Sequence, residues 1–132
     1  MAPIINGIGL AVADMATSLT FYRRLGLDVP ASAGNEPHVE AELPGGIRLM
    51  WDTHKSLASM DPGYVADSGR RTGPSLAFLC ADPAEVDQQH ADLIAAGAEN
   101  EKAPWDAEWG QRYAQLRDPD GYLVELFAWL KK

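Results

Sequence analysis

Cysteine and basic charge are both scarce in this sequence. Cys80 is the only cysteine, so no intramolecular disulfide can form and the fold does not depend on an oxidising compartment. The 11 Lys and Arg residues are outnumbered by 19 Asp and Glu residues, which gives a net charge of −8 at pH 7. This balance argues against binding to nucleic acids or anionic membranes, because both interactions draw on clusters of Lys and Arg.

Long apolar runs are missing as well. No segment approaches the roughly 20 apolar residues of a membrane helix, and the N-terminus lacks the pattern of an export signal. The 132 residues, 46% of them hydrophobic, fit one compact domain and leave no room for separate cofactor and substrate domains. We therefore expect a cytoplasmic protein whose site lies within one compact unit or between two copies of it.

The first half of the chain predicts one strand, one helix and three further strands. Residues 4–13 alternate larger apolar side chains with Gly and Ala, as in a strand with one packed face. Asp14 is a suitable N-cap for a helix that ends at Gly26. Three strands are predicted after this helix, near residues 27–29, over 36–43 and over 47–52.

The second half repeats this order. A strand over 75–81 is followed by a helix that begins after Asp82 and ends near Gly97. Further strands are predicted before Pro104, over 111–117 and over 122–127. Asp82 follows Asp14 by 68 residues, and Gly121 follows Gly46 by 75 residues. These offsets predict an α+β fold of two βαβββ modules, residues 1–72 and 73–132, joined by a polar stretch over about 53–73.

Three segments resemble the vicinal oxygen chelate superfamily, which includes glyoxalases, extradiol dioxygenases and proteins that bind bleomycin or mitomycin. They are Val12–Met15, Phe21–Gly26 and Arg117–Phe127. The resemblance covers essentially the whole chain. It implies that the two modules form a cup of curved mixed sheet with the helices on its outer face. It does not fix the chemistry, because the same fold carries unrelated activities.

Further segments resemble one branch of that superfamily, the metal-free proteins that confer resistance by binding mitomycin. They are Pro37–Ala41, Gly45–Leu49 with Trp51–Thr53, and Pro104–Trp105 with Trp109–Ala114. This narrower resemblance implies antibiotic resistance through drug binding. It also implies a homodimer whose two cups are completed across the subunit interface.

The resemblance places the four metal-ligand positions of the superfamily at Gly7, Met50, Ser75 and Glu125. Glycine has no side chain to offer, a methionine thioether suits a site of oxygen and nitrogen ligands poorly, and serine is a rare ligand. Glu125 by itself cannot hold a divalent ion. We therefore expect no metal at the inherited positions and no cofactor.

The residues themselves leave two alternatives open. His38 and Glu40 are two residues apart and share a strand face, so together with Glu125 they are candidates for a relocated metal site. Glu125, if buried among apolar side chains, would have a raised pKa and would act as a general base. Either arrangement would make the protein a glyoxalase-like lyase or isomerase, or a dioxygenase, rather than a binding protein.

The predicted lining of the cup suits a bulky organic molecule. The unpacked faces of the two first strands carry mostly Gly, Ala and Ser, whose small size leaves volume for a ligand. The candidate ligand-binding residues are His38, Glu40, Met50, Trp105, Trp109, Tyr113, Glu125 and Phe127. Trp105 and Trp109 are expected in a turn-rich loop, and the resemblance implies that Trp109 and His38 flank a planar ring by aromatic stacking.

Other residues of these types are assigned to structural roles. Trp51 alternates with apolar neighbours and is expected in the core, while Trp129 is expected in a C-terminal packing or dimer contact. Cys80 belongs to a packed face, where a thiol is inert. His54 is expected in the connecting stretch, and His90 on the solvated border of the second helix.

The acidic side chains near the lining favour a neutral or cationic ligand, because Glu40 and Glu125 would repel an anion. Together with the resemblance, the sequence predicts a metal-independent protein that sequesters a planar aromatic antibiotic or related natural product of the bleomycin or mitomycin type. Its expected partners are that small molecule and a second copy of the chain, with no nucleic acid and no membrane.

Overall fold

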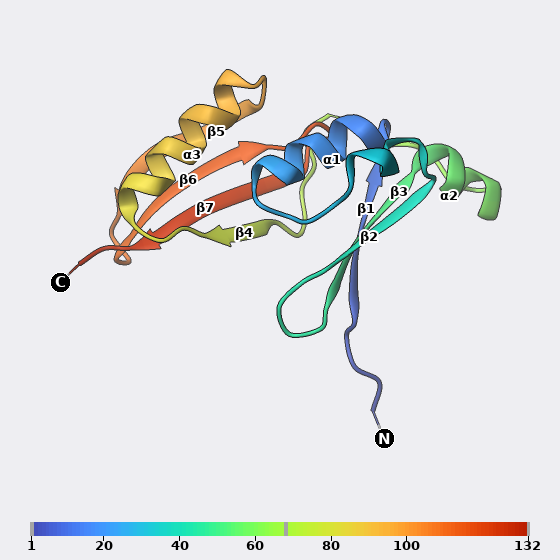
Figure 1. The fold of residues 1–132 in the computed structure, drawn as a ribbon, viewed down its shortest axis with the longest axis horizontal. Coiled ribbons are helices and arrows are strands. Elements are labelled where there is room, and N and C mark those ends of the chain that lie inside the picture. The colour runs from blue at the N-terminus through green and yellow to red at the C-terminus, as the bar shows by residue number, and fades with distance from the viewer. Residues whose placement is uncertain (1, 68, 132) are drawn as a thin grey trace. The chain divides into compact units, whose positions relative to one another are not determined.

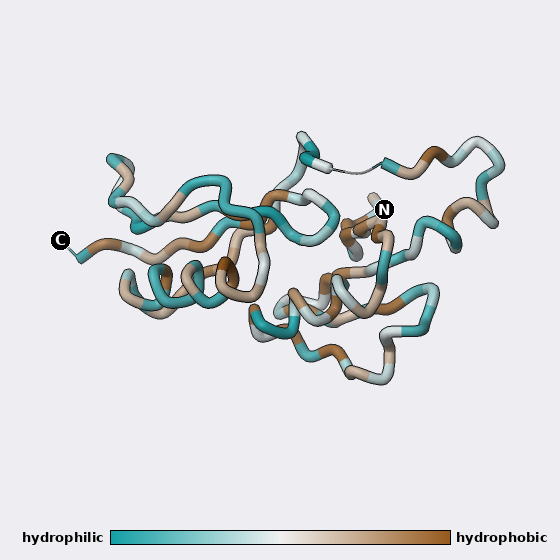
Figure 2. Tube along the Cα trace, turned by 90° about the horizontal axis from the view of Figure 1, so that it is seen from above, coloured by the Kyte–Doolittle hydropathy of each residue, from teal (hydrophilic) through white to brown (hydrophobic). Residues whose placement is uncertain are grey.

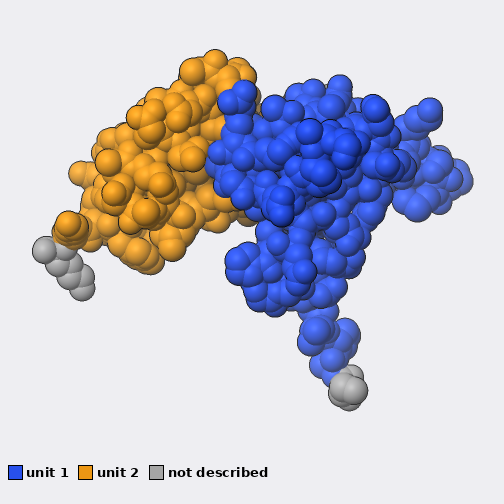
Figure 3. Space-filling view, in the orientation of Figure 1, with its two compact units in different colours: residues 1–67 blue, residues 68–132 orange. Residues whose placement is uncertain are grey.

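The computed structural model describes residues 2–67 and 69–131 (Figure 1). This part of the chain contains three α-helices, a short 3-10 helix and seven strands in two mixed sheets, which confirms the predicted α+β class. The chain divides into two compact units, Met1–Asp67 (unit 1) and Ser68–Lys132 (unit 2), and each unit holds one sheet (Figure 3). Within the described residues, no helix has both the length and the apolar character that crossing a bilayer requires.

Unit 1 folds as a strand, a helix and a hairpin, followed by a second short helix. Its elements are β1 (Gly7–Val12), α1 (Met15–Arg24), a 3-10 helix (Ala31–Asn35), β2 (His38–Glu42), β3 (Arg48–Thr53) and α2 (His54–Met60). β3 is the central strand, parallel to β1 and antiparallel to β2. Two parallel strands need a long crossover between them, and the segment that contains α1 provides it.

The helix α1 forms because its first turn is capped and its apolar residues share one face. The Asp14 carboxylate accepts a hydrogen bond from the backbone N–H of Thr17 at 3.2 Å. Leu19 and Tyr22 of α1 and Trp51 of β3 are completely buried, and the rings of Tyr22 and Trp51 meet edge to face with centroids 5.6 Å apart. Burying each of these large side chains contributes about 1.5–3 kcal/mol. The predicted core position of Trp51 is confirmed.

Unit 2 contains a strand, a helix and three antiparallel-paired strands. Its elements are β4 (Leu76–Leu79), α3 (Pro83–Ala95), β5 (Glu99–Ala107), β6 (Gln111–Arg117) and β7 (Leu123–Trp129). The sheet has the order β4-β7-β6-β5, and α3 packs on one face of it with Val86 and Leu93 buried. Along the strands, apolar residues alternate with more polar ones, as the colour changes along the tube in Figure 2 show. Each sheet therefore has one face in the core and one face that its own helix leaves open.

The two sheets repeat the same pairing register. Equivalent pairs are Ile8–Leu49 with Leu76–Val124, and His38–Asp52 with Tyr113–Phe127. The first strands are offset by 68 residues, whereas β3 and β7, like the hairpins that contain them, are offset by 75. These are the two offsets found in the sequence, so residues at equivalent offsets occupy equivalent positions on their sheets.

Unit 1 differs from its predicted pattern in two places. Residues 27–29 do not form a strand, and Pro30, which has no N–H to donate, leads into the 3-10 helix instead. Unit 1 therefore has three strands where the sequence predicts four. The connecting stretch, predicted without helix, begins with α2, and the Thr53 hydroxyl caps it by accepting from the N–H of Ser56 at 3.1 Å. His54 is the first residue of this helix.

Unit 2 differs in its third element, since β5 runs through Pro104 to Ala107. Proline is tolerated because β5 is the edge strand and its register with β6 shifts between Lys102 and Trp105. Trp105 consequently lies in a strand, not in the predicted turn-rich loop. His90 also differs, because it is buried in α3 with its Nε2 2.8 Å from Oδ1 of Asn100.

The first residues of unit 2 are anchored to the turn between β6 and β7. The N–H of Arg71 donates to the carbonyl of Gly121 at 3.1 Å, and the guanidinium of Arg117 donates to the carbonyls of Arg71 at 2.7 Å and Gly121 at 3.2 Å. Arg117 is buried and also forms an ion pair with Glu101 at 3.0 Å. A Cβ atom added to Gly121 would overlap the carbonyl oxygen of Gly69. This close approach requires glycine.

The substitution Gly121→Ala is expected to lower the free energy of unfolding by more than about 1 kcal/mol, because it combines a positive φ of 88° with the overlap against Gly69. Gly97→Ala is the matched control, since φ is 105° there but no atom lies within 4 Å of the added Cβ. Denaturant unfolding of both variants measures the difference. Equal losses would contradict the role given to the contact with Gly69.

Candidate functional site

The predicted site residues lie on the open faces of the two sheets. We call His38, Glu40, Arg48, Met50 and Asp52 the charged face of unit 1. We call Trp105, Trp109, Tyr113, Phe127 and Trp129 the aromatic face of unit 2. The strands explain the first grouping, because residues at alternate positions of β2 and β3 point to the side away from α1. The same alternation in β5, β6 and β7 produces the second grouping, to which the β5–β6 turn adds Trp109.

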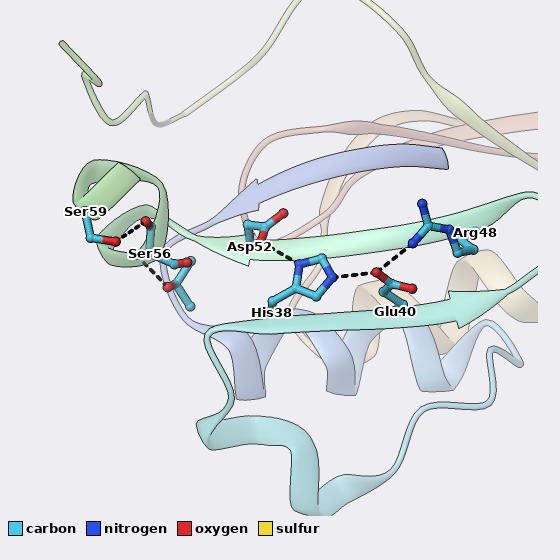
Figure 4. A network of polar contacts seen from close by, with 7 residues as sticks. His38, Glu40, Arg48, Asp52, Ser56 and Ser59 are labelled. Carbon is cyan, nitrogen blue, oxygen red and sulfur yellow. Dashed lines mark hydrogen bonds and ion pairs between the residues drawn. The ribbon is translucent and has the colours of Figure 1, made fainter. Parts of the chain in front are cut away.

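A chain of alternating charges crosses the charged face (Figure 4). His38 Nδ1 lies 2.6 Å from Oδ1 of Asp52, and His38 Nε2 lies 2.7 Å from Oε2 of Glu40. The same oxygen of Glu40 accepts from Nη1 of Arg48 at 2.8 Å, and Nε of Arg48 donates to Oδ1 of Asn6 at 3.1 Å. Strand register makes this chain possible, because His38 is directly opposite Asp52 across β2 and β3.

These contacts change the protonation of His38 and Glu40. Hydrogen bonds to Glu40 and Asp52 raise the pKa of His38 above its ordinary value of 6.5, and they outweigh the opposing effect of its small burial. Hydrogen bonds from His38 and Arg48 lower the pKa of Glu40. Ionised carboxylates only accept hydrogen bonds, so the imidazolium form of His38 satisfies both neighbours by donating from both ring nitrogens.

This arrangement does not suit a relocated metal at His38 and Glu40. A histidine binds a metal through the lone pair of a neutral ring, whereas both ring nitrogens of His38 face carboxylates. In the described ranges, 2–67 and 69–131, no three His, Cys, Asp or Glu side chains are grouped so that they could hold one metal ion.

The four positions that the resemblance assigns to metal ligands form two pairs. In unit 1, the methyl group of Met50 lies where a Cβ at Gly7 would be, at 2.6 Å from that hypothetical atom. In unit 2, the hydroxyl of Ser75 donates to Oε1 of Glu125 at 2.6 Å. The first pair presents a thioether and no nitrogen or oxygen side-chain donor. The second pair presents one carboxylate that is already hydrogen-bonded.

The aromatic face is a continuous set of rings in edge-to-face contact. Tyr113 lies at its centre, with its ring centroid 5.5 Å from those of Trp105 and Trp109 and 6.3 Å from that of Phe127. Phe127 in turn contacts Trp129 at 6.1 Å. Trp109 is 56% exposed and Trp129 is 63% exposed. Within unit 2 these rings are therefore free to meet a ligand.

Glu125 lies beside this aromatic set and is held by neutral donors. Ser75 donates to one carboxylate oxygen, Gln115 Nε2 donates to the other at 2.9 Å, and Tyr113 also hydrogen-bonds the carboxylate. Partial burial favours a higher pKa, but these three hydrogen bonds together lower the pKa of Glu125 below its ordinary value. Burial and the bond to Glu125 raise the pKa of Tyr113 to about 12. Glu125 is therefore an anion at neutral pH and a weak base, which does not fit the expected general base with a raised pKa.

The structure brings the predicted residues together in two groups. His38, Glu40 and Met50 share the charged face, and the remaining predicted residues, Trp105, Trp109, Tyr113, Glu125 and Phe127, share the open face of unit 2. Sequence reasoning missed the partners that set their charge, above all Asp52 and Gln115. Hairpin register was the available signal, because the residue opposite His38 follows from the length of the turn between β2 and β3.

Comparison with known proteins follows from this geometry. A family model described as the Glyoxalase/Bleomycin resistance protein/Dioxygenase superfamily matches residues 4–126. The chain belongs to this superfamily. The match covers both units, and it confirms the resemblance at the level of the superfamily. The narrower likeness to mitomycin-binding proteins stays a prediction.

Relatives of the chain within this superfamily are similar over nearly their whole length. An uncharacterized protein from Bacillus subtilis, YraH, is 30% identical over 125 residues, which cover 93% of this chain and 96% of YraH. A glyoxalase/bleomycin resistance protein/dioxygenase from Nocardioides has a crystal structure that is 28% identical, with a TM-score of 0.70 and coverage of 99% of this chain and 86% of that one.

A more distant structural relative shows the fold alone. The lactoylglutathione lyase from Agrobacterium tumefaciens is 22% identical, with a TM-score of 0.62 and coverage of 97% of this chain and 95% of the lyase. The superfamily thus contains both enzymes and resistance proteins. Its name does not choose between them, and the side chains of the open faces must decide.

The titration of His38 tests the charged face. His38 is expected to titrate above pH 6.5, and Asp52→Asn is expected to lower its pKa because the substitution removes one of its two carboxylate partners. A raised pKa in the folded state stabilises the protein fully below about pH 6.5, and this stabilisation is lost as the pH rises through the raised value. NMR of the His38 ring protons measures the midpoint.

Glu42→Gln is the control for this titration. Glu42 lies on the same strand and the same face but pairs across the sheet with Arg48 instead of Asp52. Its substitution is expected to leave the His38 midpoint nearly unchanged. A midpoint in Asp52→Asn equal to that of the unmodified protein would contradict the contact between the two side chains.

Proposed function

We propose that the protein is a metal-independent binding protein that sequesters a planar aromatic antibiotic or related natural product, acting as a homodimer. The observation that carries this proposal is the aromatic face, where five rings form one contiguous set and two indoles are more than half exposed. Exposed aromatic surface gains free energy when a flat ligand covers it. The bleomycin resistance proteins named within the superfamily give this binding function a precedent.

The arrangement of the rings supports a flat ligand in particular. Trp105 is nearly perpendicular to Trp109, at 89°, and Tyr113 makes angles of 73° and 78° with the two indoles. Edge-to-face packing fixes the rings without pairing their flat faces with one another. A planar ligand that stacks on one of these rings gains about 0.5–1.5 kcal/mol for each aromatic contact beyond the burial of apolar area.

The alternative is a glyoxalase-like lyase or isomerase, or a dioxygenase, with a relocated metal and Glu125 as base or ligand. It has less support from the side chains. Proton abstraction is favoured by a base whose pKa lies near the working pH, whereas hydrogen bonds hold the pKa of Glu125 low. His38, the strongest metal ligand of the alternative, has both ring nitrogens engaged by carboxylates.

Removal of the Trp109 ring tests the proposal. Isothermal calorimetry of Trp109→Ala with mitomycin-type and bleomycin-type compounds is expected to show affinity about tenfold lower than that of the unmodified protein, because one stacking surface is lost. Trp109→Phe is the matched control, since it keeps a ring but removes the indole N–H that donates to Gln111 at 2.8 Å. This control is expected to retain most of the affinity.

Tryptophan fluorescence supplies an independent readout of the same experiment. Trp51 is completely buried in unit 1, whereas the other three tryptophans belong to the aromatic face. Binding is therefore expected to quench the emission of the exposed indoles and to leave the contribution of Trp51. Absence of both quenching and calorimetric heat across a panel of planar drugs would refute the proposal.

Metal dependence separates the binding protein from the enzyme. Treatment with a chelator is expected to leave the calorimetric affinity unchanged, because the proposed contacts are aromatic and involve no metal ligand. Elemental analysis of protein purified without chelators accompanies this measurement. One tightly bound Ni, Zn, Mn or Fe ion per chain would favour the enzyme over the binding protein.

A further inference from the structure

The carboxylate of Glu125 is placed directly next to the aromatic face. Glu125 lies in β7 between Ala77 of β4 and Gln115 of β6, and two residues further along the same strand Phe127 pairs with Tyr113. Residues two apart on a strand point to the same side. A ligand stacked on Tyr113 or Phe127 therefore lies within one strand position of a carboxylate.

Glu125 differs from the other carboxylates of the structure in the kind of partner it has. Glu40, Asp52, Asp87, Glu101 and Asp106 each contact an Arg or His side chain. The donors to Glu125 are the hydroxyl of Ser75, the amide of Gln115 and the phenol of Tyr113, all of them neutral. Within residues 69–131, no basic side chain forms an ion pair with it.

This environment leaves Glu125 with an uncompensated negative charge and a free acceptor position. An ionised carboxylate offers about four acceptor positions, and three donors occupy three of them. Its partial burial weakens hydration, and the interaction of a charge with an opposite charge is stronger where water is partly excluded. The neutral donors keep the carboxylate ionised without cancelling its charge.

The neighbouring rings favour the same sign of charge in a ligand. The faces of aromatic rings carry partial negative charge and attract cations. One example exists on this face already, because the ammonium of Lys102 lies 4.1 Å from the ring centroid of Trp105. Carboxylate and rings together thus disfavour an anion and favour a cation.

We infer that the ligand of the aromatic face is an aromatic organic cation, a planar ring system with a protonated nitrogen whose N–H donates to the free acceptor position of Glu125. This inference rests on the proposed function and adds the charge of the ligand and the residue that selects it. The rings hold the flat part of the ligand, and Glu125 distinguishes a cation from a neutral molecule of the same shape.

Three probes with the same three-ring frame test the inference at pH 7: proflavine as the cation, acridone as the neutral compound and acridine-9-carboxylate as the anion. Calorimetry is expected to show proflavine binding about tenfold more tightly than acridone, because a charge-assisted hydrogen bond is stronger than a neutral one. Acridine-9-carboxylate is expected to bind most weakly. In Glu125→Gln, the affinities for proflavine and acridone are expected to become nearly equal while the affinity for acridone is retained.

Glu108→Gln is the matched control, because Glu108 is exposed in the β5–β6 turn and the substitution changes the net charge by the same amount. It is expected to preserve the preference for proflavine. Salt gives a second measurement on the unmodified protein: raising the ionic strength from about 0.05 M to about 0.5 M is expected to narrow the preference and to leave acridone binding unchanged.

The outcomes distinguish this inference from the proposed function. Equal affinity for all three probes in the unmodified protein would overturn the selection of cations and leave aromatic binding supported. A preference for proflavine that persists in Glu125→Gln would overturn the role of Glu125. Binding of none of the three probes would count against aromatic binding and the inference together.

Discussion

Parallel pairing of the first strand with the last strand of each hairpin determines which surfaces the protein has to offer. β1 pairs with β3 and β4 pairs with β7 in this way, and each parallel pair needs a helical crossover that lies on one face of its sheet. The helix fills that face with apolar side chains, so polar and aromatic residues at alternate strand positions have only the opposite face. Both candidate ligand surfaces are consequences of this constraint.

The same framework carries very different side chains in the two units. The position of His38 in unit 1 is the position of Tyr113 in unit 2, and Asp52 corresponds to Phe127. Unit 1 has used these positions for a chain of ion pairs that neutralises most of its own charge. Unit 2 has used them for rings and has left one carboxylate without a cation. The duplicated backbone thus supports two separate chemical surfaces.

Much of this could be predicted from the sequence, because it depends on periodicity and on strong local signals. Asp14 and Asp82 marked the starts of α1 and α3, and the glycine turns marked the hairpins, so the fold class and the open-face residues followed. Other features depended on contacts distant in sequence. The pKa of Glu125 is lowered by three donors from β6 and the segment before β4, and burial alone suggested the opposite direction. Trp105 was assigned to a loop because Pro104 precedes it, and only the register shift in an edge strand shows why proline is tolerated there.

Each unit is built from one uninterrupted stretch of chain, residues 1–67 and 68–132. All the strand pairs of a sheet therefore form between segments that are synthesised close together in time. Domains fold largely in the order in which they are made, so the sheet of unit 1 can be assembled before the tryptophans of the aromatic face have been translated. The most aggregation-prone surface of the protein is thus the last to be exposed during synthesis, which shortens the time available for it to find a wrong partner.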